Sequence, residues 1–217
     1  MSRYDYIFLD LDGTLSDSAP GIINSVIYAL DKMGAPVNDR SQLKQFVGPP
    51  LYESFKSVFG FDQAKADEAV RLFRVYYQDK GIHENTIYPG IEELLGTLRA
   101  AGKKLVLATS KPEQFAREIL ADYGISELFE YIAGSTMDET RIKKAEVIAY
   151  AMETLGLTDT SRIVMVGDRR HDAEGAAAFN IDCIGVLFGY GSREELLAAG
   201  AKYLAETPAD VARLILD

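Results

Sequence analysis

The chain has 217 residues, of which 47% are hydrophobic and 26% are charged, a composition that excludes a disordered or fibrous protein. Its 33 acidic residues outnumber 23 Lys and Arg residues, so the formal net charge is −10. A surface this acidic disfavours binding to nucleic acid polymers and to membranes, because both attract basic proteins. The length allows one domain of about 150 residues and a smaller one of roughly 60 to 70.

The beginning of the chain and its cysteine content favour a cytoplasmic protein. Residues 1–5 lead into a short apolar segment without the pattern of a signal peptide, and no apolar stretch approaches the roughly 18 residues of a membrane span. The single cysteine, Cys183, excludes a framework of intramolecular disulfides and suits a reducing compartment. We therefore expect no membrane partner.

The first third of the chain predicts one strand followed by helices. Residues 4–9 are a β-favouring run that ends at acidic residues, as a buried strand leading into a functional loop does. Helical patterns then precede the next strand, at residues 20–33, 41–46, 51–59 and 62–80. This run of helices predicts an inserted helical bundle.

From residue 91 onward, helices and strands alternate. The expected helices cover residues 91–101, 112–123, 143–155, 172–179, 194–199 and 209–216. The expected strands cover residues 104–108, 131–133, 162–166 and 183–186, with a short strand near Tyr203. Alternation at this spacing predicts right-handed crossovers and an α/β fold with a doubly wound, mainly parallel sheet.

Three of the predicted strands end at reactive side chains, and ligands of open α/β sheets bind beyond such carboxyl ends. The first strand leads into Asp10-Leu11-Asp12-Gly13-Thr14-Leu15. The strand at 104–108 leads into Thr109-Ser110-Lys111, and the strand at 162–166 leads into Gly167-Asp168-Arg169-Arg170-His171-Asp172. Lys144, at the start of a helix, is a fourth candidate.

The acidic residues at these strand ends predict a metal site. Asp10 and Asp12 project in the same direction if the strand geometry persists, and two carboxylates this close need a cation between them. Asp168 adds a third hard oxygen ligand, so the set matches the octahedral preference of Mg²⁺. The alternative is that Asp12 belongs to a turn and that Asp10, Asp168 and Asp172 cap local structure, since Asp is common at such positions.

In order and spacing, these segments resemble the four motifs of the haloacid-dehalogenase-type phosphatases. The matching residues are Asp10-Leu11-Asp12-Gly13-Thr14-Leu15, Thr109, Lys144 and Gly167-Asp168 with Asp172. Within the family, the resemblance is to phosphoglycolate phosphatase and 5′-nucleotidase-like members, through Val47-Gly48-Pro49-Pro50-Leu51, Tyr88-Pro89-Gly90 and Gly167-Asp168-Arg169. It covers essentially the whole chain and implies a Rossmann-like core of residues 1–15 and 88–217, with an α-helical cap of residues 16–87.

The resemblance also implies a reaction, the hydrolysis of a small phosphate ester such as phosphoglycolate or a nucleoside 5′-monophosphate. Asp10 would attack phosphorus to form an aspartyl-phosphate, and Asp12 would protonate the leaving alcohol and later deprotonate the hydrolytic water. Asp10, the backbone carbonyl of Asp12, and Asp168 would hold Mg²⁺, with Asp172 supporting them. Thr109 and Lys144 would bind the transferring oxygens.

Several assignments stay open. Lys143 and Lys144 are adjacent, and Lys144 is preferred because Ala145-Glu146-Val147-Ile148 follows it in the family's manner. Ser110 and Lys111 either lie near the substrate phosphate or belong to the start of a helix. Gly48 and Pro49 are our candidates for substrate contacts in the cap.

Two other functions fit the same motifs. A sugar phosphomutase shares all four and differs in protecting its phosphoenzyme from water. A non-enzymatic phospho-aspartate switch also uses a strand-end Asp with Mg²⁺. Proteins of that class, the phospho-receivers, have no cap and are about half this length. We expect a monomer or a weak homodimer.

Overall fold

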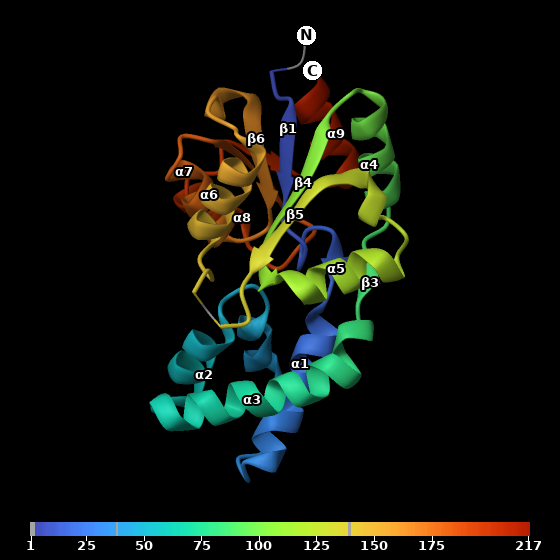
Figure 1. Cartoon of the computed structure of the whole chain (residues 1–217). Coiled ribbons are helices and arrows are strands. Elements are labelled where there is room, and N and C mark those ends of the chain that lie inside the picture. Colours follow the sequence, from blue (N-terminus) through green and yellow to red (C-terminus); the bar gives the residue numbers. More distant parts are fainter. Residues whose placement is uncertain (1–2, 38, 139) are drawn as a thin grey trace. The chain divides into compact units, whose positions relative to one another are not determined.

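The computed structural model describes residues 3–37, 39–138 and 140–217 (Figure 1). The chain divides into two compact units. One ends at Ser16 and resumes over Ile87–Asp217, and the other is Asp17–Thr86. Each boundary lies one residue from the predicted one.

The larger unit contains a six-stranded sheet in the order β5-β4-β1-β6-β7-β8, and its strand pairs are parallel. The strands are β1 (Tyr6–Leu9), β4 (Lys104–Pro112), β5 (Phe129–Ser135), β6 (Ile163–Gly167), β7 (Asp182–Val186) and β8 (Tyr203–Ala205). The chain passes from β1 to β4 and β5, then crosses to β6 on the other side of β1. The predicted fold class is therefore confirmed, and the strand order reverses at β1, where open α/β sheets bind ligands.

Helices cover both faces of this sheet (Figure 1). They are α4 (Ile91–Ala100), α5 (Glu113–Asp122), α6 (Lys144–Leu155), α7 (Arg170–Ala177), α8 (Arg193–Ala198) and α9 (Pro208–Leu216). Because both faces are covered, Ile7, Phe8 and Leu9 of β1 are all fully buried. One apolar core joins the sheet to α6 and α7 and includes Phe8, Val106, Ala108, Met165, Cys183, Val147 and Ile148.

The smaller unit is helical. It contains α1 (Ala19–Lys32), the 3₁₀ helix η1 (Arg40–Phe46), α2 (Leu51–Phe59), α3 (Gln63–Asp79) and the 3₁₀ helix η2 (Gly81–His83). The helical pattern predicted at 41–46 corresponds to η1, which is a 3₁₀ helix, because so short a segment gains few i to i+4 hydrogen bonds. No helix among the residues that the structure describes has both the length and the apolar character needed to cross a membrane.

Two short strands at the junctions between the units were not predicted. Strand β2 (Ser16–Asp17) pairs with β3 (Thr86–Ile87). A strand of two residues is too short to show alternation of polar and apolar side chains, so the sequence pattern could not reveal it.

Strand β4 is longer than predicted. It continues through Pro112, whereas the sequence placed a helix start there, and α5 begins one residue later. Ala108 pairs with Ala133 and Pro112 with Ser135, so β4 advances four residues where β5 advances two. Such an irregularity redirects side chains locally, and it falls on Thr109, Ser110 and Lys111.

Candidate active site

Strand register brings the acidic residues together at one end of the sheet. Leu9 is aligned with Leu107 of β4 and with Val166 of β6. The next residue, Asp10, therefore lies level with Ala108 of β4 and with Gly167, the last residue of β6, and its backbone N–H donates to the Val166 carbonyl at 3.0 Å. Asp168 directly follows β6, so it emerges beside Asp10.

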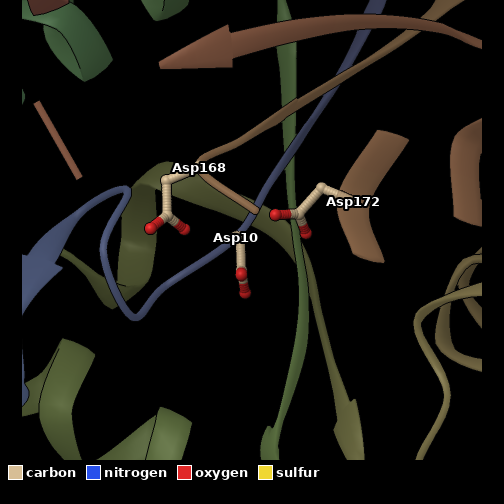
Figure 2. A group of neighbouring side chains, drawn as sticks. All are labelled: Asp10, Asp168 and Asp172. Atoms are coloured by element: carbon tan, nitrogen blue, oxygen red, sulfur yellow. The ribbon is translucent and has the colours of Figure 1, made fainter. Parts of the chain in front are cut away.

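Three carboxylates form a buried cluster at this end of the sheet. Oxygens of Asp10, Asp168 and Asp172 all lie within 4.8 Å of one another. Figure 2 shows these side chains gathered where the chain leaves β1 and β6, with Asp172 contributed by the first turn of α7. The exposed fractions of the three residues are 6%, 0% and 1%. Carboxylates so fully removed from water need compensating charge.

The Asp10 carboxylate is held through one of its two oxygens. Its Oδ1 accepts a hydrogen bond from the Leu11 backbone N–H at 2.8 Å and lies 2.8 Å from Lys144 Nζ. Within the described part of the chain, Oδ2 accepts no hydrogen bond. Burial raises the pKa of Asp10, and Lys144 opposes that shift. The arrangement fixes the side chain while leaving one oxygen available.

Lys144 is the cation inside the cluster. Its Nζ donates to the Ala108 carbonyl and lies 2.8 Å from Asp10 Oδ1 and from Asp172 Oδ1. Burial by itself would lower the pKa of Lys144, but the two carboxylates outweigh burial and raise it. The neighbouring Lys143 is exposed at the start of α6. The structure thus brings Lys144, and not Lys143, to the acidic residues.

Asp12 lies outside the three-carboxylate cluster and forms an ion pair with Lys111. Lys111 Nζ lies 2.9 Å from Asp12 Oδ2, and both side chains are largely buried. Asp12 Oδ1 is buried and accepts no hydrogen bond from any described residue. The sequence analysis left the role of Lys111 undecided. Its position in the sequence could have placed it near the site: Lys111 lies two residues beyond Thr109, and residues two apart in a strand lie on the same face.

Thr109 and Ser110 lie in β4, next to β1. Thr109 is 1% exposed, and its Oγ1 accepts the Lys111 backbone N–H at 3.2 Å. The Thr109 O–H therefore remains able to donate to a ligand. Ser110 is half-buried.

Gly13 allows the segment after β1 to pass close to Asp168. Its φ is +81°, and a Cβ atom there would lie 2.2 Å from Asp168 Oδ2. An L-residue would be strained by this φ and would displace the carboxylate. The Asp-x-Asp-Gly pattern therefore includes a glycine that the close approach to Asp168 requires.

The acidic cluster has the charge and the ligand atoms for a divalent cation. Three carboxylates and the Lys144 ammonium leave two negative charges uncompensated. Burial raises the pKa of Asp168, and the negative charges of Asp172 and Asp10 raise it further. A bound divalent cation would remove this imbalance, and carboxylate oxygens are the ligands that Mg²⁺ prefers. The residues present therefore fit Mg²⁺.

Gly48 and Pro49 belong to the helical unit. They lie between η1 and α2, and Gly48 has a φ of +101°. Their part in substrate binding stays a prediction.

The profile of the protein family described as Haloacid dehalogenase-like hydrolase matches residues 6–186, which is most of the chain. The chain belongs to the haloacid dehalogenase-like hydrolases. The predicted family is therefore confirmed, and the acidic cluster lies within the matched residues.

Individual members of this hydrolase family are similar over most of the chain. A 5′-nucleotidase of Pseudomonas aeruginosa is 43% identical over 196 residues, covering 90% of this chain and 88% of the relative. A phosphoglycolate phosphatase of Colwellia psychrerythraea is 30% identical over 95% of both chains. The crystal structure of a predicted phosphatase from Clostridium acetobutylicum superposes with a TM-score of 0.95 at 44% identity, covering 99% of each chain.

One similar protein is named for a different activity. The tyrosine-protein kinase PtkA of Mycobacterium tuberculosis is 44% identical over 185 residues. The alignment covers 85% of this chain but only 62% of the kinase. Its kinase activity is therefore a property of a longer protein.

Proposed function

We propose that this hydrolase is a Mg²⁺-dependent phosphomonoesterase that acts through an aspartyl-phosphate on Asp10. The observation that carries the proposal is the Asp10 carboxylate itself. It stands at the end of β1, held through one oxygen by Leu11 N–H and Lys144, beside Asp168 and Asp172. The relatives named 5′-nucleotidase and phosphoglycolate phosphatase, both phosphoric monoester hydrolases, support the same reaction class.

In the first step, an Asp10 oxygen forms a bond to phosphorus while the bond from phosphorus to the ester oxygen breaks. Asp12 donates a proton to the departing alcohol. In the second step, water attacks the phosphorus of the aspartyl-phosphate, Asp12 accepts the proton of that water, and the Asp10 carboxylate is released. The ion pair with Lys111 holds the Asp12 carboxylate in place.

Positive charge is essential for the first step. A carboxylate about 4 Å from a phosphate dianion is repelled by about 8 kcal/mol at an effective dielectric constant near 20. Lys144 supplies one compensating charge next to Asp10, and the Thr109 hydroxyl donates to a phosphoryl oxygen. Asp10, the Asp12 backbone carbonyl and Asp168 would hold Mg²⁺. When bound, it supplies further positive charge and orients the phosphate.

We propose that the substrate is a small phosphorylated metabolite, either a nucleoside 5′-monophosphate or phosphoglycolate. Both compounds are the substrates implied by the names of similar proteins. We place the reaction in the cytoplasm and expect the helical unit to act as the cap that selects the substrate.

The test is phosphate release in the presence of Mg²⁺ from a panel of phosphoglycolate, nucleoside 5′-monophosphates, sugar phosphates and phosphotyrosine. We expect rapid release from one of the first two classes. Failure to release phosphate from any compound, together with a trapped aspartyl-phosphate, would instead support a phosphomutase or a phospho-aspartate switch.

Removal of the metal is expected to abolish hydrolysis and to destabilise the fold. The acidic cluster has excess negative charge without a divalent cation, so chelation with EDTA should lower the melting temperature, and added Mg²⁺ should restore it. At a Mg²⁺ concentration 100 times its dissociation constant, the stabilisation is about 2.7 kcal/mol. Phosphate release and thermal melting measure the two effects. Full activity after rigorous chelation would refute the metal requirement.

Replacing Lys111 with Met is expected to lower kcat about 10- to 100-fold, because the Asp12 carboxylate loses its ion pair and its fixed position. We also expect a loss of up to about 3 kcal/mol in the free energy of unfolding, since a largely buried carboxylate is left unpaired. Steady-state kinetics and urea denaturation measure these changes. Lys104→Met is the control, because Lys104 is exposed at the opposite end of the same strand. Normal kcat in Lys111→Met would show that Asp12 needs no such partner.

Shortening residues 48–51 is expected to change the ranking of substrates in the panel by about tenfold in kcat/KM, while Mg²⁺ affinity stays the same. The reason is that the acidic cluster lies entirely in the other unit. Kinetics on the panel and calorimetric titration with Mg²⁺ check the two parts. Altered Mg²⁺ affinity with unchanged substrate ranking would contradict the proposed role of Gly48 and Pro49.

A further inference from the structure

The loop of residues 187–192, which connects β7 to α8, lies directly against Asp168. The Tyr190 backbone N–H donates a hydrogen bond to Asp168 Oδ2 at 2.8 Å. The other oxygen, Oδ1, has a longer contact of 3.4 Å with Thr14 Oγ1. One oxygen of the carboxylate is thus held by the loop, while the other remains available to a cation.

Two glycines allow the loop to approach this closely. A Cβ atom on Gly189 would lie 2.2 Å from the Gly13 carbonyl oxygen and 2.4 Å from Asp168 Cβ. A Cβ atom on Gly191 would lie 1.9 Å from the Asp168 carbonyl oxygen. These contacts involve backbone atoms or the first side-chain atom of Asp168, so they cannot be relieved by a change of rotamer. A methyl group at either glycine must move the loop or Asp168.

Both ends of the loop are fixed. At its start, Leu187 N–H donates to the Ala205 carbonyl at 2.9 Å, and the Phe188 ring packs edge-to-face on Tyr88. At its end, Ser192 Oγ accepts the Glu195 backbone N–H at the start of α8.

Glu195 also connects α8 to the residues that follow Asp168. Its Oε1 accepts hydrogen bonds from Arg169 Nε at 2.8 Å and from the Arg170 backbone N–H at 2.9 Å. The chain on both sides of the contact between the loop and Asp168 is therefore held in place.

We propose that the 187–192 loop positions Asp168 for metal binding, and that Gly189 and Gly191 are positioning residues for this purpose. The inference rests on the proposed function, in which Asp168 is a metal ligand. The Tyr190 N–H fixes the rotation of the Asp168 carboxylate through Oδ2 and leaves Oδ1 available to a cation. A ligand oriented in advance loses less conformational freedom when the metal binds, so affinity increases.

The test is the affinity of the full chain for Mn²⁺ and Mg²⁺ without substrate, measured by calorimetric titration and, for Mn²⁺, by electron paramagnetic resonance. We expect Gly189→Ala and Gly191→Ala to weaken binding 10- to 100-fold. We also expect saturating Mg²⁺ to restore most of kcat, because the substitutions displace a ligand without removing any reacting group. Circular dichroism establishes that each variant is folded.

Two matched glycine variants serve as controls. Gly96→Ala lies on α4, where a Cβ atom meets nothing within 4 Å, so metal affinity should be unchanged. Gly185→Ala lies in β7, where a Cβ atom meets methyl groups of Leu196 and Leu204. Gly185→Ala should lower the free energy of unfolding without moving Asp168. It therefore separates a loss of stability from a loss of metal affinity.

The outcomes distinguish this inference from the proposed function. If the wild-type chain binds neither metal, the proposed function fails and the inference fails with it. If the wild type binds metal and both folded alanine variants bind equally well, only the inference is overturned. If neither alanine variant folds, Glu195→Ala is tested in their place, because Glu195 holds the residues that follow Asp168. A loss of at least about threefold in metal affinity supports the inference, and unchanged affinity overturns it.

Discussion

Asp10→Asn is expected to abolish phosphate release, with kcat at least about 10³-fold lower, while the chain remains folded. The amide keeps the shape of the side chain but removes the charge with which we propose that Asp10 attacks phosphorus. Burial raises the pKa of Asp10, against the opposing effect of Lys144. The ionised carboxylate is therefore less favourable in the folded chain than in the unfolded one, and this cost is present once the pH rises above the unfolded pKa. At neutral pH, a neutral Asn should leave the metal-free fold as stable as the wild type, or more stable.

Phosphate release and urea denaturation in EDTA measure both effects of Asp10→Asn. Asp5→Asn is the matched control, because Asp5 lies just before β1, at the opposite end from Asp10, where it pairs with Arg162. That pair is exposed, so its loss should cost less than about 1 kcal/mol and leave kcat unchanged. Turnover within tenfold of the wild type in Asp10→Asn would refute the assignment of the nucleophile.

Lys144→Met is expected to cause the largest loss of stability in the core of the site, about 3–5 kcal/mol in the absence of metal. Methionine preserves much of the side-chain volume but removes the ammonium group that lies between Asp10 and Asp172. The acidic cluster would then contain three buried carboxylates with no internal cation. Mg²⁺ should consequently stabilise this variant more than it stabilises the wild type. Its kcat should fall at least about 100-fold even at saturating Mg²⁺, because Asp10 loses its orienting partner.

Urea denaturation with EDTA and with Mg²⁺ compares the two chains. Lys143→Met is the control for Lys144→Met, since Lys143 is adjacent in sequence and exposed. We expect Lys143→Met to change the free energy of unfolding by less than about 0.5 kcal/mol. A larger loss of stability and activity in Lys143→Met than in Lys144→Met would reverse our choice between the two lysines.

The parts of the fold that the sequence predicted are those that leave a local pattern. The strand at the N-terminus, the alternation of strands and helices after residue 91 and the acidic strand ends all follow from periodicity and from the order of residue types. The parts that the sequence missed are short or irregular. Strands β2 and β3 have two residues each, and β4 continues to Pro112 through a shift in register.

The sequence by itself determined the fold class, the family and the positions of Asp10, Asp12 and Asp168, because these depend on motifs whose residues lie close together along the chain. Only the tertiary structure decided which partners they have. It brought Lys144 between Asp10 and Asp172, paired Lys111 with Asp12, and placed the 187–192 loop on Asp168. These contacts join residues that are far apart in sequence. They depend on strand register, on the irregularity in β4 and on close backbone packing at glycines, and none of these produces a periodic signal in the sequence.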